Sequence, residues 1–135
     1  MDNSFPTPVR NLGIPKDNHN IDFFKGFVNL DNFPNLLSLS VEDKLIGLGG
    51  WTETGDDSCL IFIHFIVEYH FSIDQKNFIQ DIENEIFSNL PMVNNLSICV
   101  DDESWVGFYK SLGWLVSSRE KDGQLTKTIL KKTKL

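Results

Sequence analysis

The run from Cys59 to Phe71, CLIFIHFIVEYHF, constrains the fold more than any other stretch. Both of its alternating faces are apolar, so neither face is suited to water. Such a run is typical of a strand in the middle of a sheet that helices cover on both sides. We therefore predict an α/β or α+β chain with this strand at its centre.

A helix is predicted directly after this strand. Ser72 and Gln75 match a capping box, in which the serine oxygen accepts a hydrogen bond from the third helical amide. The helix should end before Pro91, because the residue before a proline is pushed out of the helical region. Its apolar residues at helical spacing are Phe78, Ile79, Ile82 and Ile86. The acidic residues expected on its exposed face are Asp81, Glu83 and Glu85.

A second strand and helix occupy the stretch LSICVDDESWVGFYKSLGW, from Leu96 to Trp114. Leu96 to Val100 reads as a short strand, and Asp101 to Ser104 supply the side-chain oxygens that cap a helix start. Gly113 stands where a left-handed residue ends a helix. The apolar face predicted for this helix consists of Trp105, Phe108, Tyr109 and Leu112.

Two hairpins complete the pattern. The first joins strands at Leu36 to Val41 and Leu45 to Thr54, and the glycines of the second strand predict a bulge or a close backbone contact. The second joins Trp114 to Arg119 with Gln124 to Lys131 through an Asp-Gly turn. The predicted order from residue 36 is β-β-β-α-β-α-β-β, in a mixed central sheet.

Residues 1–35 are expected to form an irregular N-terminal segment, and residues 36–135 the folded domain. The segment holds four prolines, Pro6, Pro8, Pro15 and Pro34, so strands are unlikely to be accommodated there. A short helix is predicted around Asp22 to Leu30.

Charge and composition narrow the function. A net charge of -7 argues against nucleic acid as a partner, because affinity for phosphate backbones needs clustered Lys and Arg. The longest apolar run is too short to span a membrane. Cys59 and Cys99 are interpreted as reduced and buried, which favours a cytoplasmic protein. The three histidines have no metal-ligand spacing with these cysteines, so no metal site is predicted.

The pattern aromatic-Tyr-x-x-Leu-Gly-aromatic, carried here by Phe108, Tyr109, Leu112, Gly113 and Trp114, resembles the C-terminal half of the Gcn5-related N-acetyltransferase (GNAT) superfamily. The resemblance implies the GNAT fold over residues 36–131 and transfer of acetyl from acetyl-CoA to a small amine or a protein amine. It implies that Tyr109 protonates the leaving thiolate and that Glu68 or His70 deprotonates the amine.

The same resemblance places acetyl-CoA against Val67, Gln75, Lys76 and Asn77, where the backbone amide near Val67 would polarise the thioester carbonyl. The family's pyrophosphate loop carries glycines, but no glycine lies between Gly55 and Gly107. We therefore also expect a degenerate cofactor loop.

A catalytically inactive protein-binding module on the same scaffold is the alternative. Asp74 to Phe87, followed by LSICV and by a helix ending Ser-Leu-Gly-Trp, is loosely similar to ornithine decarboxylase antizymes, which have a GNAT-like fold, lack the CoA loop and bind an enzyme subunit. This alternative implies a basic protein partner that contacts the acidic helix faces, at Asp81, Glu83 and Glu85 or at Asp101 to Glu103.

Overall fold

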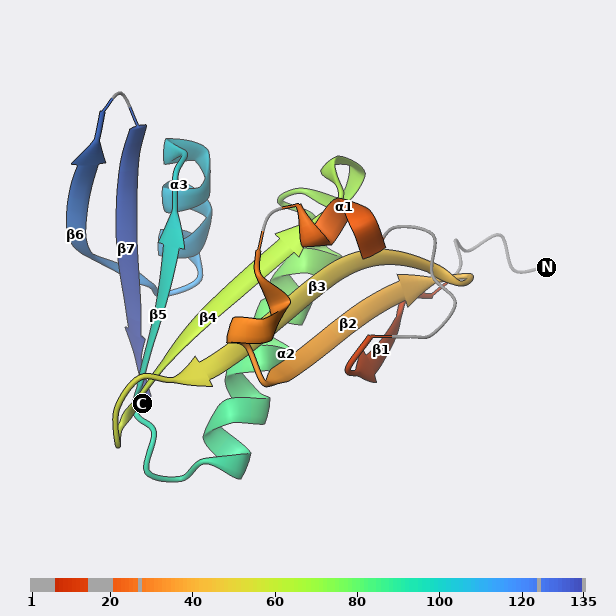
Figure 1. Cartoon of the computed structure of the whole chain (residues 1–135), viewed down its shortest axis with the longest axis horizontal. Helices are drawn as coiled ribbons and strands as arrows, with labels where there is room; N and C mark the ends of the chain where they lie inside the picture. Colours follow the sequence, from red (N-terminus) through yellow and green to blue (C-terminus); the bar gives the residue numbers. More distant parts are fainter. Residues whose placement is uncertain (1–6, 15–20, 27, 124, 135) are drawn as a thin grey trace. The chain divides into compact units, whose positions relative to one another are not determined.

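The computed structural model describes residues 7–14, 21–26, 28–123 and 125–134 (Figure 1). The helices are α1 (Ile21–Lys25), α2 (Ile73–Asn89) and α3 (Glu103–Ser111), with short 3-10 helices η1 (Leu30–Asn32) and η2 (Val67–Tyr69). The strands are β1 (Val9–Leu12), β2 (Asn35–Val41), β3 (Lys44–Glu53), β4 (Ser58–Phe65), β5 (Asn95–Val100), β6 (Leu115–Asp122) and β7 (Leu125–Thr133). These seven strands are hydrogen-bonded in the order β1-β2-β3-β4-β5-β7-β6.

The predicted order of elements from residue 36 is confirmed. β2 to β7 and the two longer helices follow one another as β-β-β-α-β-α-β-β. The sheet is mixed, because β4 and β5 run parallel while β5 and β7, and β6 and β7, run antiparallel. The Asp-Gly turn joins β6 to β7, and Gly123 adopts a φ of 65° there.

Two predictions about the positions of strands are wrong. A strand, β1, lies inside the segment where none was expected, and it pairs antiparallel with β2 from Val9 opposite Ser40 to Leu12 opposite Leu37. β4 ends at Phe65 and not at Phe71, because the chain turns into η2 at Val67. The predicted helix around Asp22 to Leu30 is present in part, as α1 and η1.

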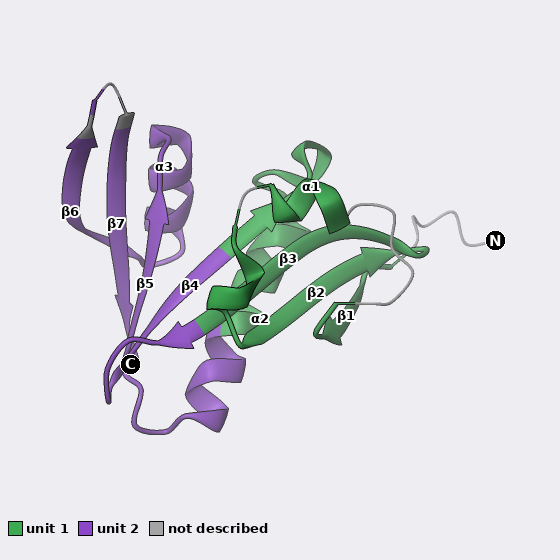
Figure 2. Ribbon diagram, in the orientation of Figure 1, with its two compact units in different colours: residues 1–51, 63–82 green, residues 52–62, 83–135 purple. Residues whose placement is uncertain are grey.

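The chain divides into two compact units (Figure 2). Residues 1–51 and 63–82 make up the first unit, and residues 52–62 and 83–135 make up the second. The domain boundary predicted at residue 35 stays a prediction. None of the helices in the described ranges is long and apolar enough to cross a bilayer.

In the first unit, α1 and the first half of α2 cover the strands (Figure 1). Phe24 of α1 is fully buried. The predicted bulge and close contact in the first hairpin are both present. The register of β2 and β3 shifts between Leu39 and Ser40. A Cβ placed on Gly47 would lie 2.5 Å from the ring of Phe65, so only glycine lets the two strands approach this closely.

In the second unit, α3 packs beside β7 and β6 (Figure 1). Its start is capped as predicted, since the Asp102 carboxylate accepts a hydrogen bond from the Ser104 amide at 2.7 Å. The apolar face is rotated from the predicted one: Val106 and Tyr109 are buried, whereas Trp105, Phe108 and Leu112 are only half-buried.

The end of α3 is a Schellman motif. Gly113 has a φ of 96°, the Trp114 amide donates to the Tyr109 carbonyl at 3.1 Å, and the Gly113 amide donates to the Lys110 carbonyl at 3.1 Å. The rings of Tyr109 and Trp114 meet edge to face with centroids 5.6 Å apart, which is the apolar contact that accompanies this motif. The prediction that Gly113 ends the helix is confirmed.

Both cysteines are free thiols, but only Cys59 is buried; Cys99 on β5 is exposed, and the prediction of its burial is wrong. The alternation along β5 explains this error, because Leu96 and Ile98 take the buried face.

Candidate functional site

Several backbone amides at the start of α2 already donate hydrogen bonds to groups of the same turn. The Gln75 amide donates to the Ser72 hydroxyl at 3.2 Å, as the capping box predicts. The Gln75 side-chain oxygen accepts from the Phe71 amide at 3.0 Å, and the Ser72 amide donates to the Tyr69 carbonyl at 3.2 Å. The amides of Ile73 and Asp74 are therefore the donors that this helix start offers to an anion.

Apolar side chains and a left-handed residue surround this helix start. Phe71 has a φ of 62°, a conformation that side chains other than glycine rarely adopt. Val67 and Ile73 are mostly exposed, and Phe71 is about half exposed, at 46%. The turn is thus made by an aromatic residue in a conformation that glycine adopts more readily.

The candidate cofactor residues fall into two groups at this turn. Gln75 is fully buried, and its Nε2 atom has no hydrogen-bond partner, while its side-chain oxygen closes the turn. Lys76 and Asn77 are exposed on the first turn of α2. Val67 is exposed in η2, and its carbonyl accepts a hydrogen bond from the His70 amide at 3.1 Å.

The two candidate bases lie in or beside η2. Glu68 is exposed. His70 is half-buried, and its Nε2 atom lies 2.8 Å from the Phe65 carbonyl oxygen. A carbonyl only accepts hydrogen bonds, so Nε2 carries the proton and Nδ1 is the basic nitrogen of the neutral ring.

Tyr109 lies in the second unit and is only 1% exposed. Burial, followed by the nearby charge of Glu83, raises the pKa of its phenol far above the ordinary value of 10.0. The phenol is therefore protonated across the physiological range.

Glu83 is buried, so the prediction that it faces solvent is wrong. It lies on α2 with only 5% of its surface exposed, and its Oε1 atom is 2.6 Å from Lys132 Nζ on β7. Burial raises the pKa of this carboxyl, and Lys132 opposes that effect. Asp81 is a surface residue, 3.5 Å from Arg10.

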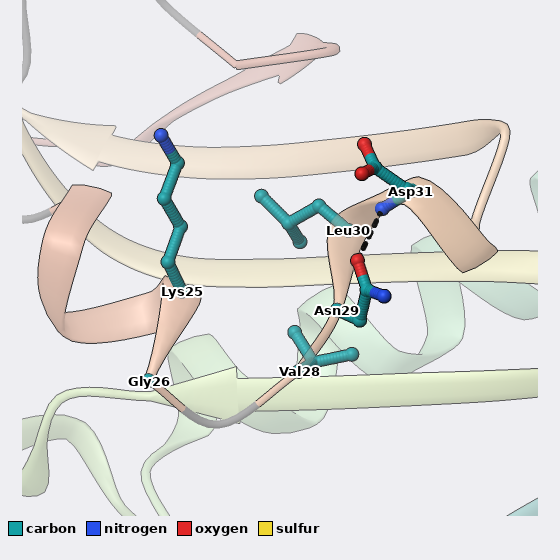
Figure 3. Close-up of a pocket in the computed structure, with 6 residues that line it drawn as sticks. All are labelled: Lys25, Gly26, Val28, Asn29, Leu30 and Asp31. Atoms are coloured by element: carbon teal, nitrogen blue, oxygen red, sulfur yellow. Dashed lines mark hydrogen bonds between the residues drawn. The ribbon is translucent and has the colours of Figure 1, made fainter.

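A cavity of about 600 Å³ lies between α1 and η1 in the first unit (Figure 3). Lys25 and Asp31 supply charges of opposite sign, and the side chain of Leu30 extends between them. The Asn29 side chain accepts a hydrogen bond from the Asp31 amide at 3.1 Å and so fixes one wall. In the described ranges, no three His, Cys, Asp or Glu side chains gather as metal ligands.

Sequence reasoning missed this cavity and the Glu83–Lys132 pair. The cavity residues have no periodic pattern in the sequence. Glu83 did carry a signal, because it stands four residues after Ile79 and three before Ile86, on the apolar stripe of α2.

No protein-family model matches the sequence, and no curated protein is significantly similar to it. Solved structures are similar in fold. The spermidine/spermine N-acetyltransferase of Vibrio cholerae superposes with a TM-score of 0.71 at 13% identity, over 93% of this chain and 92% of that chain. A GNAT family acetyltransferase from Elizabethkingia anophelis, solved with acetyl-CoA bound, gives 0.68 at 10% identity, over 93% and 97%.

This chain has the GNAT fold. An N-acetyltransferase of Campylobacter jejuni agrees, with a TM-score of 0.64 at 14% identity over 95% of this chain and 99% of that one. The fold expected from the resemblance is confirmed by these neighbours. In this GNAT fold the candidate residues fall in both units: Tyr109 in the second, and Glu68, His70 and the start of α2 in the first.

Proposed function

We propose that this protein is an acetyl-CoA-dependent N-acetyltransferase that acts on an amine. The observation that carries the proposal is Tyr109, a buried and protonated phenol on α3 of a GNAT fold, held by the Schellman motif that ends the helix. Structural neighbours include one spermidine/spermine N-acetyltransferase and one acetyltransferase with acetyl-CoA bound. An acceptor of the polyamine class also suits the acidic chain, with its net charge of -7.

In the proposed reaction, the amine nitrogen attacks the thioester carbonyl carbon and forms the new C–N bond. The C–S bond breaks, and its electron pair leaves on the CoA sulfur. Tyr109 gives its proton to that sulfur, and Glu68 or Nδ1 of His70 takes the proton of the attacking amine, directly or through a water molecule. The products are the acetamide and CoA, and proton exchange with solvent restores both side chains.

The acyl donor would be held differently from a glycine-loop enzyme. Two amides of the α2 start, at Ile73 and Asp74, and the side chains of Lys76 and Asn77 remain for the pyrophosphate, while Gln75 and Ser72 occupy the others. The amide near Val67 would polarise the thioester carbonyl. We expect weaker CoA binding than in an enzyme whose helix start offers all its amides to the pyrophosphate. Asp74 weakens the binding further, because it adds a negative charge beside the phosphates.

Two measurements test the proposal. Isothermal titration with acetyl-CoA should show micromolar binding, and CoA release should follow when an amine panel including spermidine is added. Tyr109→Phe should lower kcat by about 10- to 100-fold, since it removes a proton donor. Tyr69→Phe is the matched control and should leave kcat unchanged. Full activity of Tyr109→Phe would contradict the role of Tyr109.

A second candidate function is a CoA-independent protein-binding module with a basic partner. The observation that favours it is the bond from the Phe71 amide to Gln75, which uses a donor that a pyrophosphate would need. No binding of acetyl-CoA at millimolar concentration, together with a stoichiometric co-purifying partner that Asp101→Lys releases, would favour this candidate. Tight CoA binding would exclude it.

A further inference from the structure

The buried carboxylate of Glu83 is connected to the end of α3 through one side chain. Lys132 Nζ lies 2.6 Å from Glu83 Oε1 and donates to the Leu112 carbonyl at 2.9 Å. Leu112 is the C-cap of α3, so its carbonyl is one of those that the helix leaves without an internal partner. Lys132 therefore bridges α2 and the last turn of α3, within the second unit.

This bridge acts on the turn that carries Tyr109. The Trp114 amide donates to the Tyr109 carbonyl, and the two rings are in contact. The methylenes of Lys132 also pass beside Gly113, within 3.6 Å of where a Cβ would stand. A shift of the Leu112 carbonyl would therefore move the turn and with it the Tyr109 ring.

The polar atoms around Tyr109 are not all satisfied. Glu83 Oε2 and Trp114 Nε1 are buried and have no hydrogen-bond partner. A buried carboxylate oxygen without a hydrogen-bond partner lowers the free energy of unfolding. Such an atom therefore calls for an explanation in terms of strain or function. The charged groups concerned are Glu83 from α2 and Lys132 from β7, whose Nζ atom lies 2.6 Å from Glu83 Oε1.

On the premise that Tyr109 is the proton donor of the proposed acetyl transfer, we propose that Glu83 is its positioning residue. Glu83 holds Lys132 against the Leu112 carbonyl, and this bond fixes the turn from which the Tyr109 side chain projects. Glu83 itself touches neither the acyl donor nor the amine.

The experiment uses a Tyr69→Phe background, in which Tyr109 is the one remaining tyrosine of the two in the chain. Glu83→Gln is compared with Glu85→Gln, a matched control on the same helix, where the Asn89 amide can still donate to the new side-chain oxygen. NMR chemical shifts of the isotope-labelled Tyr109 ring report its surroundings, and hydrogen exchange at Gly113 and Trp114 reports the turn. Both readouts are independent of catalysis.

Glu83→Gln should shift the Tyr109 ring resonances and accelerate exchange at Gly113 and Trp114 by about tenfold or more, since a charge-assisted hydrogen bond is weakened. If the protein is an active transferase, kcat should also fall by about 10- to 100-fold while the KM for acetyl-CoA changes by less than about twofold. Glu85→Gln should behave as the parent in every readout.

Unchanged Tyr109 ring resonances and unchanged exchange in Glu83→Gln would overturn the positioning role, whatever the activity. If the parent protein shows no acetyl transfer, the proposed function is overturned. The two structural readouts then still test whether Glu83 positions Tyr109. If Glu83→Gln does not fold, the double variant Glu83→Leu/Lys132→Met, which leaves no unpaired charge, is measured in the same way and should show the same two changes.

Discussion

The side-chain oxygen of Gln75 accepts a hydrogen bond from the backbone amide of Phe71 at 3.0 Å. This bond closes the turn between η2 and α2, and it holds Phe71 at a φ of 62°. The left-handed conformation costs a residue with a Cβ about 1–2 kcal/mol, so the turn keeps this strain where a glycine would have relieved it. The same bond removes one amide from the anion-binding capacity of the helix start.

Replacement of Phe71 should therefore reverse the usual order of alanine and glycine. At an ordinary position glycine is the less stable of the two, but at a positive φ the Cβ of alanine is strained. We expect Phe71→Gly to be more stable than Phe71→Ala by about 1 kcal/mol. Urea unfolding of both variants measures the difference, and comparing them cancels the loss of the half-exposed ring. A more stable alanine variant would contradict the strained turn.

The free energy of unfolding should depend on pH through the ionisation of Glu83. Burial raises the pKa of Glu83 above its ordinary value of 4.5, so the folded state binds this proton more tightly than the unfolded state. The stabilisation from this group is complete below pH 4.5 and is lost as the pH rises through the raised folded value. The unfolding free energy of the parent relative to Glu83→Gln should fall over that range, as urea titrations at several pH values would show. A rising difference would mean that Lys132 outweighs burial.

The pair formed by buried Glu83 and half-buried Lys132 should be costly to break but cheap to replace. Lys132→Met leaves the buried Glu83 carboxylate uncompensated and should destabilise the protein by about 3–5 kcal/mol. Glu83→Leu should cost less, because the Lys132 side chain is 22% exposed and partly hydrated. The double variant should lose less than either single variant, because apolar side chains then fill the space. A double-mutant cycle by chemical denaturation measures the coupling. Arg119 and Glu103, an exposed pair in the same unit, provide the control, with an expected coupling of about 1 kcal/mol or less.

The order of elements is predictable from the sequence because each element has a local signal. The Ser72 to Gln75 capping box, the Gly113 helix end and the Asp-Gly turn all act over a few residues, and all three are found in the structure. β1 has no such signal. Its residues are exposed, and its pairing with β2 joins segments that lie far apart along the chain.

The candidate site is less predictable from the sequence, because some of its contacts have no local sequence signal. The side chains of Tyr109 and Gln75 were found through patterns of neighbouring residues. The burial of Glu83 depends on Lys132, a tertiary contact between distant segments. The position of His70 depends on the Phe65 carbonyl, a local contact that has no sequence pattern of its own. Composition alone groups Glu83 with Asp81 and Glu85, whereas helical spacing places it on the buried stripe with Ile79 and Ile86.

The two glycines Gly47 and Gly107 should respond in opposite directions to alanine. A Cβ on Gly47 would stand 2.5 Å from the Phe65 ring, which packs in turn against Phe78 with centroids 5.3 Å apart, so the ring has little room to move. Gly47→Ala should therefore destabilise the protein by about 1–3 kcal/mol.

Gly107 is exposed on α3, with no atom within 4 Å of its added Cβ. Gly107→Ala should stabilise the protein by about 0.5–1 kcal/mol, because alanine favours the helix. Thermal and urea unfolding of both variants tests the pair, and a neutral Gly47→Ala would show that β3 and β4 are not in close contact at this point.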